Sequence, residues 1–493
     1  MLAQLKGFLR HSIVYSISNA AAKAMGVILL PLYTTYLSLG DFGQLAIVEV
    51  TLVIAVELFA LGQGPSIVMF NDTAEYKDGI KSIYFTIYSF SLAVALAAVL
   101  FGWSVLDIIA GFAVPLGMFE THYWVIAAIF VSRIIHGLCL DKIRAEEKSV
   151  LYTGLNLGRL LITLLVTIYF VAYEGYGIAG VLYGYLAGDG FTAIYTSLHQ
   201  FRNMTPVFRK DILPASVRFG IPLIFTSVAF MILNVSDRYI IGYYRGSEEV
   251  ALYDLGYRVA GVLNMFIIMP FTLTLLPAAY KMYGKEGDKR YYSKLLTYFT
   301  FILVWGGLAL SLYAEELIQL FALNKDYWPS YKVVPLVILG YIFSGMRLVA
   351  VLGQFLTRNL KSLIPLSLSA AFMNVTLNFV FIPLYGMMAA AYTTLLSFLF
   401  LYLLSLQISD RYYHIPFEHK KTFLLILLGS LLYLPFAFWS SEFLFFNLGL
   451  KLLLVIGFPL LLLPLKFYEE AELHVIKKIL RSPAGGFKEL VKK

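Results

Sequence analysis

Long apolar segments, separated by short clusters of polar residues, make up most of this chain. Each segment has about the 20 residues that an α-helix needs to cross the hydrocarbon core of a bilayer, and none shows the period-two alternation of membrane β-strands. The pattern therefore predicts an all-α polytopic membrane protein. Fourteen transmembrane helices are expected, over residues 12–37, 42–68, 82–105, 123–140, 150–172, 176–200, 219–244, 250–280, 292–313, 333–357, 363–384, 387–407, 422–439 and 445–465.

The composition excludes a large water-exposed domain. The chain has 493 residues, of which 60% are hydrophobic and 14% charged, with a mean hydropathy of +0.78. Soluble domains carry roughly 25% charged residues. The one cysteine, Cys139, cannot form a disulfide within the chain. The sequence has no cluster of cysteine and histidine and no Walker or HExxH motif, so no metal cluster, nucleotide or other cofactor is predicted.

Lysine and arginine residues alternate between the two sides of the predicted topology. The tails and the even-numbered connections hold 28 of the 38, whereas the odd-numbered connections hold only Arg245 and Lys325. By the positive-inside rule both termini are cytoplasmic, and the first apolar segment, which lacks a cleavage site, is retained as a helix. The formal net charge of +8 then reflects topology and contact with anionic lipid headgroups, not binding of nucleic acid.

Two short motifs recur at nearly the same offset. Residues 36–43 align with 244–251 at a shift of 208, and residues 176–177 align with 385–386 at a shift of 209. Transporters often contain such repeats, so two pseudo-symmetric six-helix lobes with two additional C-terminal helices are predicted. The predicted domains are an N-lobe over 1–201, a cytoplasmic linker over 202–218, a C-lobe over 219–408, helices 13 and 14 over 409–467, and a cytoplasmic amphipathic tail over 468–493.

Eight basic residues fall within or at the edge of predicted spans, where an ionised side chain costs at least about 2.5 kcal/mol. We predict that Lys23, Arg159 and Arg258 line a cationic cavity between the lobes that receives a phosphate-bearing substrate, because guanidinium groups bind phosphate oxygens bidentately. The alternative for Arg258 is an ion pair with Asp254, one helical turn earlier. The alternative for Arg133 is an anchor at the membrane interface. Further candidate cavity charges are Glu57, Arg133, Asp189, Asp254 and Arg347.

A second group consists of neutral oxygens with one carboxylate. Asn374 and Asn378 share a helix face, and Asp237 and Thr394 belong to two other predicted helices of the same lobe. Such a set suits Na⁺ better than Mg²⁺ or Ca²⁺. The alternative is structural: the asparagines form hydrogen bonds between helices, and Asp237 pairs with Arg238 or another base.

Several passages resemble the polysaccharide transporter branch of the multidrug/oligosaccharidyl-lipid/polysaccharide flippase superfamily. They are LPLYTTYLSLGDFG at 30–43, SDRYIIGYY at 236–244, ALYDLGYR at 251–258, the pair Leu276 and Pro277, and the pair Tyr385 and Gly386. The resemblance covers nearly the whole chain and rests on the order and spacing of these passages. It implies fourteen helices, two lobes that alternate access around a central cavity, and a substrate of undecaprenyl-diphosphate-linked oligosaccharide.

Lipid II flippases of this superfamily are similar in using basic residues on helices 1 and 8 for the diphosphate, which implies that role for Lys23 and Arg258. Their sodium site draws on helices 7, 11 and 12. By resemblance its ligands here are Asp237, Asn374, Asn378 and Thr394. Asn378 stands where a second carboxylate is expected, and this departure leaves Na⁺ coupling, H⁺ coupling and no coupling open.

These observations predict a transporter that flips a lipid-linked glycan from the inner to the outer leaflet of the bacterial cytoplasmic membrane, for cell-surface polysaccharide biosynthesis. The expected partners are the polyprenyl-diphosphate-linked glycan, membrane lipids and other polysaccharide-assembly membrane proteins. The alternatives are a cation-coupled multidrug antiporter or a lipid II flippase of the same superfamily. A membrane polymerase or glycosyltransferase is less favoured, because the outer connections 106–122 and 314–332 are too short for a catalytic domain. An enzyme is therefore not expected.

Overall fold

The computed structural model describes residues 26–110, 117–438, 444–470 and 473. Over these ranges the chain is helical without a β-strand, and ten of the helices are long and apolar enough to cross a membrane. The predicted class, an all-α polytopic membrane protein, is confirmed. The count of fourteen spans stays a prediction, as do the domain boundaries, and the amphipathic tail lies almost wholly outside these ranges.

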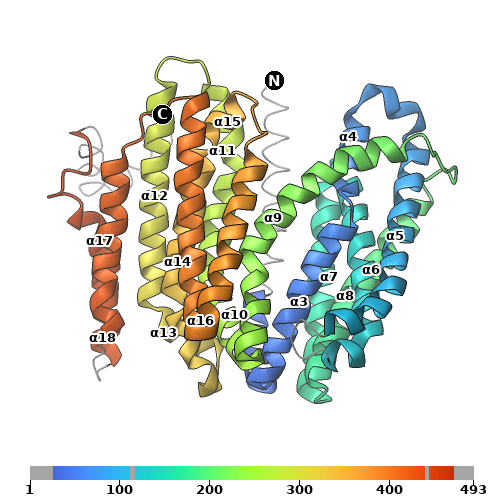
Figure 1. Ribbon diagram of the computed structural model, residues 1–493, viewed down its shortest axis with the longest axis horizontal. Coiled ribbons are helices and arrows are strands. Elements are labelled where there is room, and N and C mark those ends of the chain that lie inside the picture. The colour runs from blue at the N-terminus through green and yellow to red at the C-terminus, as the bar shows by residue number, and fades with distance from the viewer. Residues whose placement is uncertain (1–25, 111–116, 439–443, 471–472, 474–493) are drawn as a thin grey trace.

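Figure 1 shows two groups of helices side by side, connected by the long helix α9. The first group contains α2 (Leu30–Tyr36), α3 (Leu39–Phe59), α4 (Gln63–Asp72), η1 (Ala74–Gly79), α5 (Ile80–Ala110), α6 (Gly117–Ala145), α7 (Ser149–Ile168), the π-helical turn η2 (Tyr169–Tyr173) and α8 (Gly177–Phe201). Helix α8 packs against both α6 and α7. Gly184 and Gly188 allow the close approach to α7, because a Cβ atom at either position would lie within 2.0 Å of a threonine hydroxyl.

The second group follows α9. It contains α9 (Leu213–Arg245), α10 (Ser247–Leu263), the π-helical turn η3 (Asn264–Ile268), α11 (Met269–Met282), α12 (Asp288–Leu312), α13 (Ala314–Phe321), η4 (Lys325–Lys332), α14 (Val334–Ala350), α15 (Leu352–Leu356) and α16 (Leu363–Tyr412). Helices α9, α14 and α16 pack together at its centre. Helices α17 (His419–Phe438) and α18 (Leu444–Leu461) lie on the side of this group that faces away from the first group (Figure 1).

Two helix breaks differ in how well the sequence reveals them. The predicted span 42–68 is two helices, α3 and α4, separated by a bend at which Leu61 and Gly62 have positive φ. Hydropathy misses this bend because the bend residues are apolar or uncharged like their neighbours. A Cβ at Gly62 would lie 2.5 Å from the Cα of Gly220, so close contact with α9 requires glycine there. The expected boundary near residue 386 is present as a sharp kink within α16, where Gly386 has φ of 60°.

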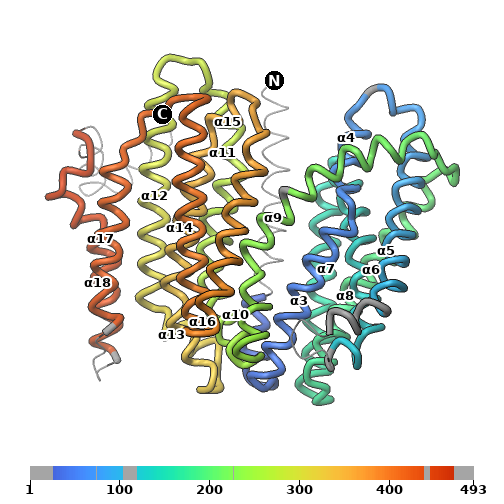
Figure 2. The backbone as a smooth tube through the Cα atoms, in the orientation of Figure 1, coloured from blue at the N-terminus to red at the C-terminus, as the bar shows by residue number. Residues whose placement is uncertain are grey.

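The two groups meet tightly at one end of the molecule. Helices α3 and α10 pack against each other, and a Cβ at Gly43 would lie 1.7 Å from the carbonyl oxygen of Ser247. The Tyr327 hydroxyl donates to the carbonyl oxygens of Leu37 and Ser38, at 3.1 and 3.0 Å. In the backbone trace of Figure 2, α4 and α15 lie apart at the opposite end. Apart from the first turns of α9, which pack on α4 at the opposite end, the contacts between the groups are therefore concentrated at the end that carries α13 and η4.

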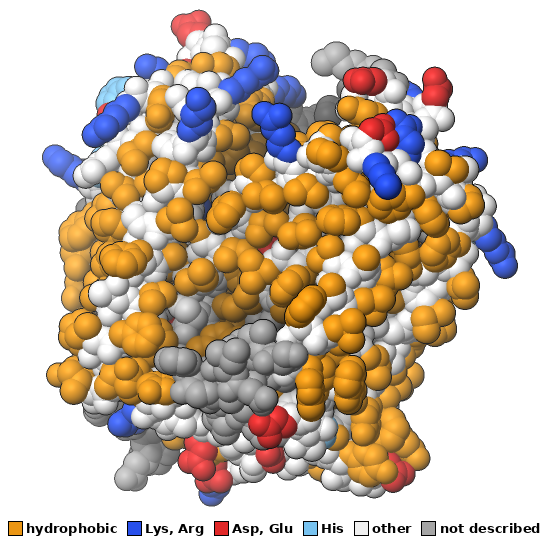
Figure 3. All heavy atoms as spheres, turned by 45° about the vertical axis from the view of Figure 1, so that its right-hand side comes forward, with side chains coloured by type: hydrophobic (Ala, Val, Ile, Leu, Met, Phe, Trp, Pro, Cys, Tyr) orange, Lys and Arg blue, Asp and Glu red, His pale blue; other side chains and the backbone are white. Residues whose placement is uncertain are grey.

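The visible surface has the charge distribution of a membrane-spanning protein. In Figure 3 a broad band of apolar side chains surrounds the middle of the molecule. Most of the visible lysine and arginine side chains lie at the end that carries α4 and α15, whereas acidic side chains predominate at the opposite end. An apolar belt between two charged ends is the arrangement that a bilayer requires.

Gly43→Ala should open the contact between α3 and α10. The added methyl group would overlap the backbone of Ser247, so the closed end should loosen. A cysteine replacing the fully buried Val250, with Cys139 changed to serine, should then react about tenfold faster with a water-soluble maleimide, which corresponds to about 1.4 kcal/mol in the opening equilibrium. Gly40→Ala is the matched control, because the atom nearest to its added Cβ, the hydroxyl oxygen of Ser247, would lie 3.6 Å away. Equal labelling in the two alanine variants would contradict the prediction.

Candidate functional site

A chain of alternating charges passes through the interior and joins the two groups of helices. Four arginines and four carboxylates take part, so these side chains together carry no net charge. In order they are Arg159, Asp189, Arg133, Glu49, Arg258, Asp254, Arg238 and Asp237. Each neighbouring pair is an ion pair except Arg133 and Glu49, which are linked through Tyr185. We call this set the charge network. It draws on α3, α6, α7, α8, α9 and α10.

Asp189 of α8 holds the part of the network that lies in the first group. Its carboxylate is almost fully buried, accepts a hydrogen bond from Arg133 and forms an ion pair with Arg159, and the two arginines belong to different helices. The Nε atom of Arg133 lies 2.8 Å from Oδ2, and the Nε atom of Arg159 lies 2.6 Å from Oδ1. The guanidinium of Arg133 also lies over the ring of Tyr185, 5.3 Å from its centre. One carboxylate therefore ties α6 and α7 to α8.

Arg258 of α10 connects the two groups. Its Nη2 atom lies 2.5 Å from Oε2 of Glu49 on α3, and its Nε atom lies 2.6 Å from Oδ2 of Asp254, one turn earlier. Glu49 also accepts from the hydroxyl of Tyr185, which in turn lies 3.1 Å from the Tyr33 hydroxyl. Because Glu49 and Arg258 belong to different groups, their ion pair fixes how the groups sit against each other.

Arg238 of α9 continues the network into the second group. Its Nε atom lies 2.9 Å from Oδ1 of Asp254, and its Nη1 atom lies 2.9 Å from Oδ1 of Asp237. The guanidinium packs over the ring of Tyr257, 4.4 Å from the ring centre. The Tyr253 hydroxyl donates to the other oxygen of Asp237. All three charged residues of this part are buried, so removal of one leaves a buried charge without its partner.

The structure brings most of the predicted cavity charges together but leaves three aside. Arg159, Arg258, Arg133, Asp189 and Asp254 are all members of the network. Lys23 lies outside the residues that the structure describes. Glu57 and Arg347 have no ion-pair partner among the described residues, and the Nε atom of Arg347 is buried without a hydrogen bond there.

The sequence analysis did not place two kinds of residue in the site. Glu49 carries a visible signal, an acidic residue in an apolar segment, but nothing in the sequence shows that its partner is 209 residues away. The tyrosines Tyr33, Tyr185, Tyr253 and Tyr257 carry no such signal, because the chain has 35 tyrosines. Both alternatives that the spacing suggested are present: Arg258 pairs with Asp254, and Asp237 pairs with Arg238.

The predicted cation ligands are buried and belong to one region, but their oxygens are already engaged. Asp237 receives hydrogen bonds from Arg238, from Tyr253 and, at 3.5 Å, from Thr394. The amide of Asn378 donates to Oδ1 of Asn374 at 3.0 Å. The Thr393 hydroxyl donates to Oδ1 of Asn378.

These residues do not fit a sodium ion in the conformation described. The one carboxylate of the set, Asp237, already pairs with Arg238, so a sodium ion would have to compete with a buried guanidinium for it. In addition, Nδ2 of Asn374 is a buried donor without an acceptor among the described residues. A donor facing the site repels a cation. Proton coupling stays a prediction.

Solved structures of transporters share this arrangement of helices. A structure of the lipid II flippase MurJ in an inward closed conformation matches with a TM-score of 0.73 at 16% identity, over 92% of this chain and 99% of that chain. An inward-facing MATE family multidrug resistance transporter of the MOP superfamily matches with a TM-score of 0.61 at 14% identity, over 83% and 98%. Its outward-facing counterpart matches with a TM-score of 0.58 at 13% identity, over 85% of this chain and 96% of that chain. The chain therefore has the fold of MOP superfamily transporters.

The sequence assigns the chain to a narrower class than the fold does, a single protein family. Residues 8–283, more than half of its length, match the family described as polysaccharide biosynthesis protein, and the chain belongs to that family. No curated protein sequence matches it. The resemblance inferred from the sequence motifs is thus confirmed: the family is one of polysaccharide biosynthesis proteins, and the fold is shared with transporters of the MOP superfamily.

Asp189→Asn should destabilise the protein, because it leaves Arg133 and Arg159 facing each other without a carboxylate. We expect a loss on the order of 2–3 kcal/mol, reduced from the fully buried value because both arginines are partly exposed. Thermal unfolding of the purified protein measures it. Asp211→Asn is the matched control, since that carboxylate pairs with Arg209 on the exposed surface. A melting temperature that both variants share with the wild type would show that the pairing at Asp189 does not support the fold.

Sodium should not stabilise the wild-type protein. Its melting temperature should agree to about 1 °C in NaCl and KCl, because Arg238 already balances Asp237. Asn378→Asp adds a second buried carboxylate to the set, and this variant should be more stable in NaCl than in KCl. Sodium-specific stabilisation of the wild type would refute this interpretation of the site.

Proposed function

We propose that this protein flips an undecaprenyl-diphosphate-linked oligosaccharide from the inner to the outer leaflet of the bacterial cytoplasmic membrane, as a step in cell-surface polysaccharide biosynthesis. The family of polysaccharide biosynthesis proteins and the fold shared with a lipid II flippase support this proposal. The observation that carries it is the ion pair of Arg258 with Glu49, which places a phosphate-binding group at the junction of the two groups of helices.

The proposed mechanism is an exchange of anions on Arg258. A guanidinium binds a phosphate through two parallel hydrogen bonds, as it binds a carboxylate. A diphosphate that reaches Arg258 therefore competes with Glu49 for the same nitrogen atoms. Once Glu49 is released, α3 and α10 lose the ion pair that joins them, and the closed end can open. Substrate binding is in this way linked to the change of access.

The surface charges support an orientation for this cycle. The end rich in lysine and arginine is assigned to the cytoplasm by the positive-inside rule, with both termini on that side. The tight contact of Gly43 with Ser247 then lies at the outer surface. The described conformation is accordingly one that is closed to the outside, before the substrate is released there.

A lipid II flippase is the second candidate, since the structure of that class matches 92% of this chain. A multidrug antiporter fits less well. The MATE transporter structures cover 83 to 85% of the chain, and α17 and α18 are the helices that extend beyond the two packed groups. Interaction with other membrane proteins of polysaccharide assembly is part of the proposal.

In liposomes that contain the purified protein, a polyprenyl-diphosphate-linked oligosaccharide should move to the outer leaflet. Periodate added outside the liposomes then oxidises its sugar, and the rate of this oxidation measures flipping. We expect Arg258→Gln to slow this about a hundredfold, because two charge-assisted hydrogen bonds to the diphosphate are lost, and Arg258→Lys about tenfold. Arg290→Gln is the matched control: that residue is exposed, pairs with Glu469 at 3.2 Å, and should leave the rate within twofold.

Three outcomes would change the assignment. A wild-type rate for Arg258→Gln would exclude the anion exchange. Equal or faster flipping of lipid II would move the assignment to that substrate. Failure to flip either lipid, together with export of cationic drugs from cells that carry the protein, would make it an antiporter.

A further inference from the structure

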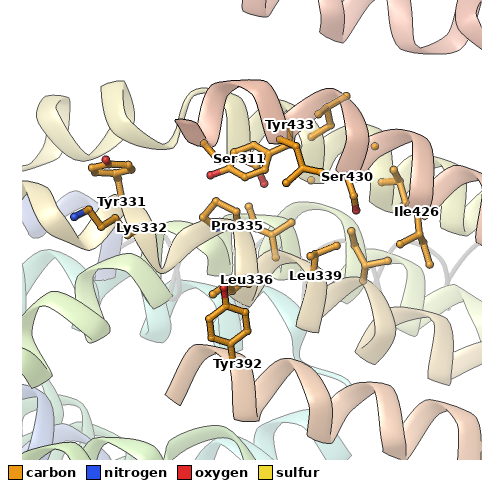
Figure 4. A pocket seen from close by; sticks show the side chains of 18 of the residues that line it. Ser311, Tyr331, Lys332, Pro335, Leu336, Leu339, Tyr392, Ile426, Ser430 and Tyr433 are labelled. Atoms are coloured by element: carbon orange, nitrogen blue, oxygen red, sulfur yellow. The ribbon is translucent and has the colours of Figure 1, made fainter. Parts of the chain in front are cut away.

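An elongated cavity of about 440 Å³ lies between α12, α14, α16 and α17, away from the charge network (Figure 4). One face of α17 borders it, with residues spaced three or four apart. These residues are Ile426, Gly429, Ser430, Tyr433, Leu434 and Ala437. On α14 the residues that line the cavity include Leu339 and Ile342, whereas Tyr341 packs against Tyr257 of the network. Helix α14 therefore separates the cavity from the proposed substrate site.

The cavity has a polar end and an apolar end. In Figure 4, Lys332 and Tyr331 lie at one end, and Leu339 and Ile426 lie toward the other. The hydroxyl of Tyr331 accompanies the lysine at this end, and Ser311 and Tyr433 lie further along the cavity. The polar end belongs to the start of α14, next to η4 and α13, which is the outer end in the proposed orientation.

Lys332 is a cation without a partner. Its side chain is exposed at the mouth of the cavity, and no carboxylate of the described residues lies within ion-pair distance. The nearby outer lysine Lys451 differs, because it is buried and pairs with Glu316 at 2.5 Å. The comparable apolar cavity between α3, α5 and α6 is lined by no charged residue at all among those described. Lys332 thus gives this cavity the charge that a lipid headgroup recognises.

We propose that this cavity binds one acyl chain of an anionic phospholipid from the outer leaflet, with the lipid phosphate on Lys332. The apolar walls accept the chain, and the hydroxyls of Tyr331 and Tyr433 can donate to the phosphate or glycerol oxygens. A phospholipid fits better than the diphosphate-linked cargo, because one ammonium balances one phosphate charge. The site goes beyond the proposed function, and only its assignment to the outer leaflet rests on the orientation proposed there.

The site would hold α17 in place. Helix α17 makes its main contact with α12, and many of its side chains are exposed. A lipid chain between α14 and α17 would fill the space that protein side chains leave open. Binding should therefore raise the thermal stability of the protein, which gives a readout that does not require transport.

The test measures thermal unfolding of the full chain in detergent while dioleoyl phosphatidylglycerol or dioleoyl phosphatidylcholine is added. Phosphatidylglycerol should raise the melting temperature at lower concentration than phosphatidylcholine. Lys332→Gln should raise the half-saturating concentration of phosphatidylglycerol about tenfold and remove the preference. Lys325→Gln is the matched control, since Lys325 lies on the same segment but over the ring of Trp328 and does not line the cavity.

A second pair of variants tests the chain-binding part. Ser430→Phe places a ring in the cavity and should abolish the response to both lipids, whereas Leu431→Phe, on the exposed side of α17, should respond as the wild type does. An unchanged preference in Lys332→Gln, which is a surface substitution and should fold normally, would overturn the proposal. Displacement of phosphatidylglycerol by an equal amount of a polyprenyl phosphate would also overturn it, because the cavity would then belong to the cargo.

Discussion

A buried arginine carries a large desolvation cost unless a carboxylate lies within hydrogen-bond distance, and this constraint organises the junction of the two groups of helices. The charge network satisfies it with four arginines and four carboxylates on six helices. Since removal of one partner leaves a buried charge uncompensated, the positions of these helices are mutually dependent. The junction between the two groups of helices is one link of this same network, so the stability of each group and the contact between them share one physical basis.

Hydropathy and charge in the sequence predicted the helical membrane fold and most of the network residues, and the resemblance of several short passages predicted the superfamily. They succeeded because apolar length and the cost of intramembrane charge are local properties of the chain. The bend at Leu61 and Gly62 was missed, because it is held by contact with α9 and leaves no polar residue in the sequence. Pairing across helices was also beyond prediction. Asp254 and Arg258 share a helix and could be paired by spacing, whereas the partner of Glu49 is fixed only by the folded structure.

The repeated motif has a structural meaning that the alignment alone does not give. Residues 36–43 and 244–251 are the two copies of one motif, and in the fold they touch: Gly43 of the first lies against Ser247 of the second. The second repeat is involved as well, because a Cβ at Gly386 would lie 2.5 Å from the carboxylate of Glu249. Three of the four recurring passages therefore meet at one closed end of the molecule, where small residues stand at the points of contact.

The neutrality of the charge network has a consequence for energy supply. A movement of these eight side chains without cargo transfers no net charge, so the membrane potential does no work on it. A cargo with a diphosphate adds negative charge to the moving part. For each elementary charge that crosses 100 mV the potential contributes about 2.3 kcal/mol, and an interior that is negative favours the outward passage of an anion. Because the arginines and carboxylates balance, the return of the empty protein moves no net charge. The membrane voltage can drive only the step in which the protein carries its anionic cargo.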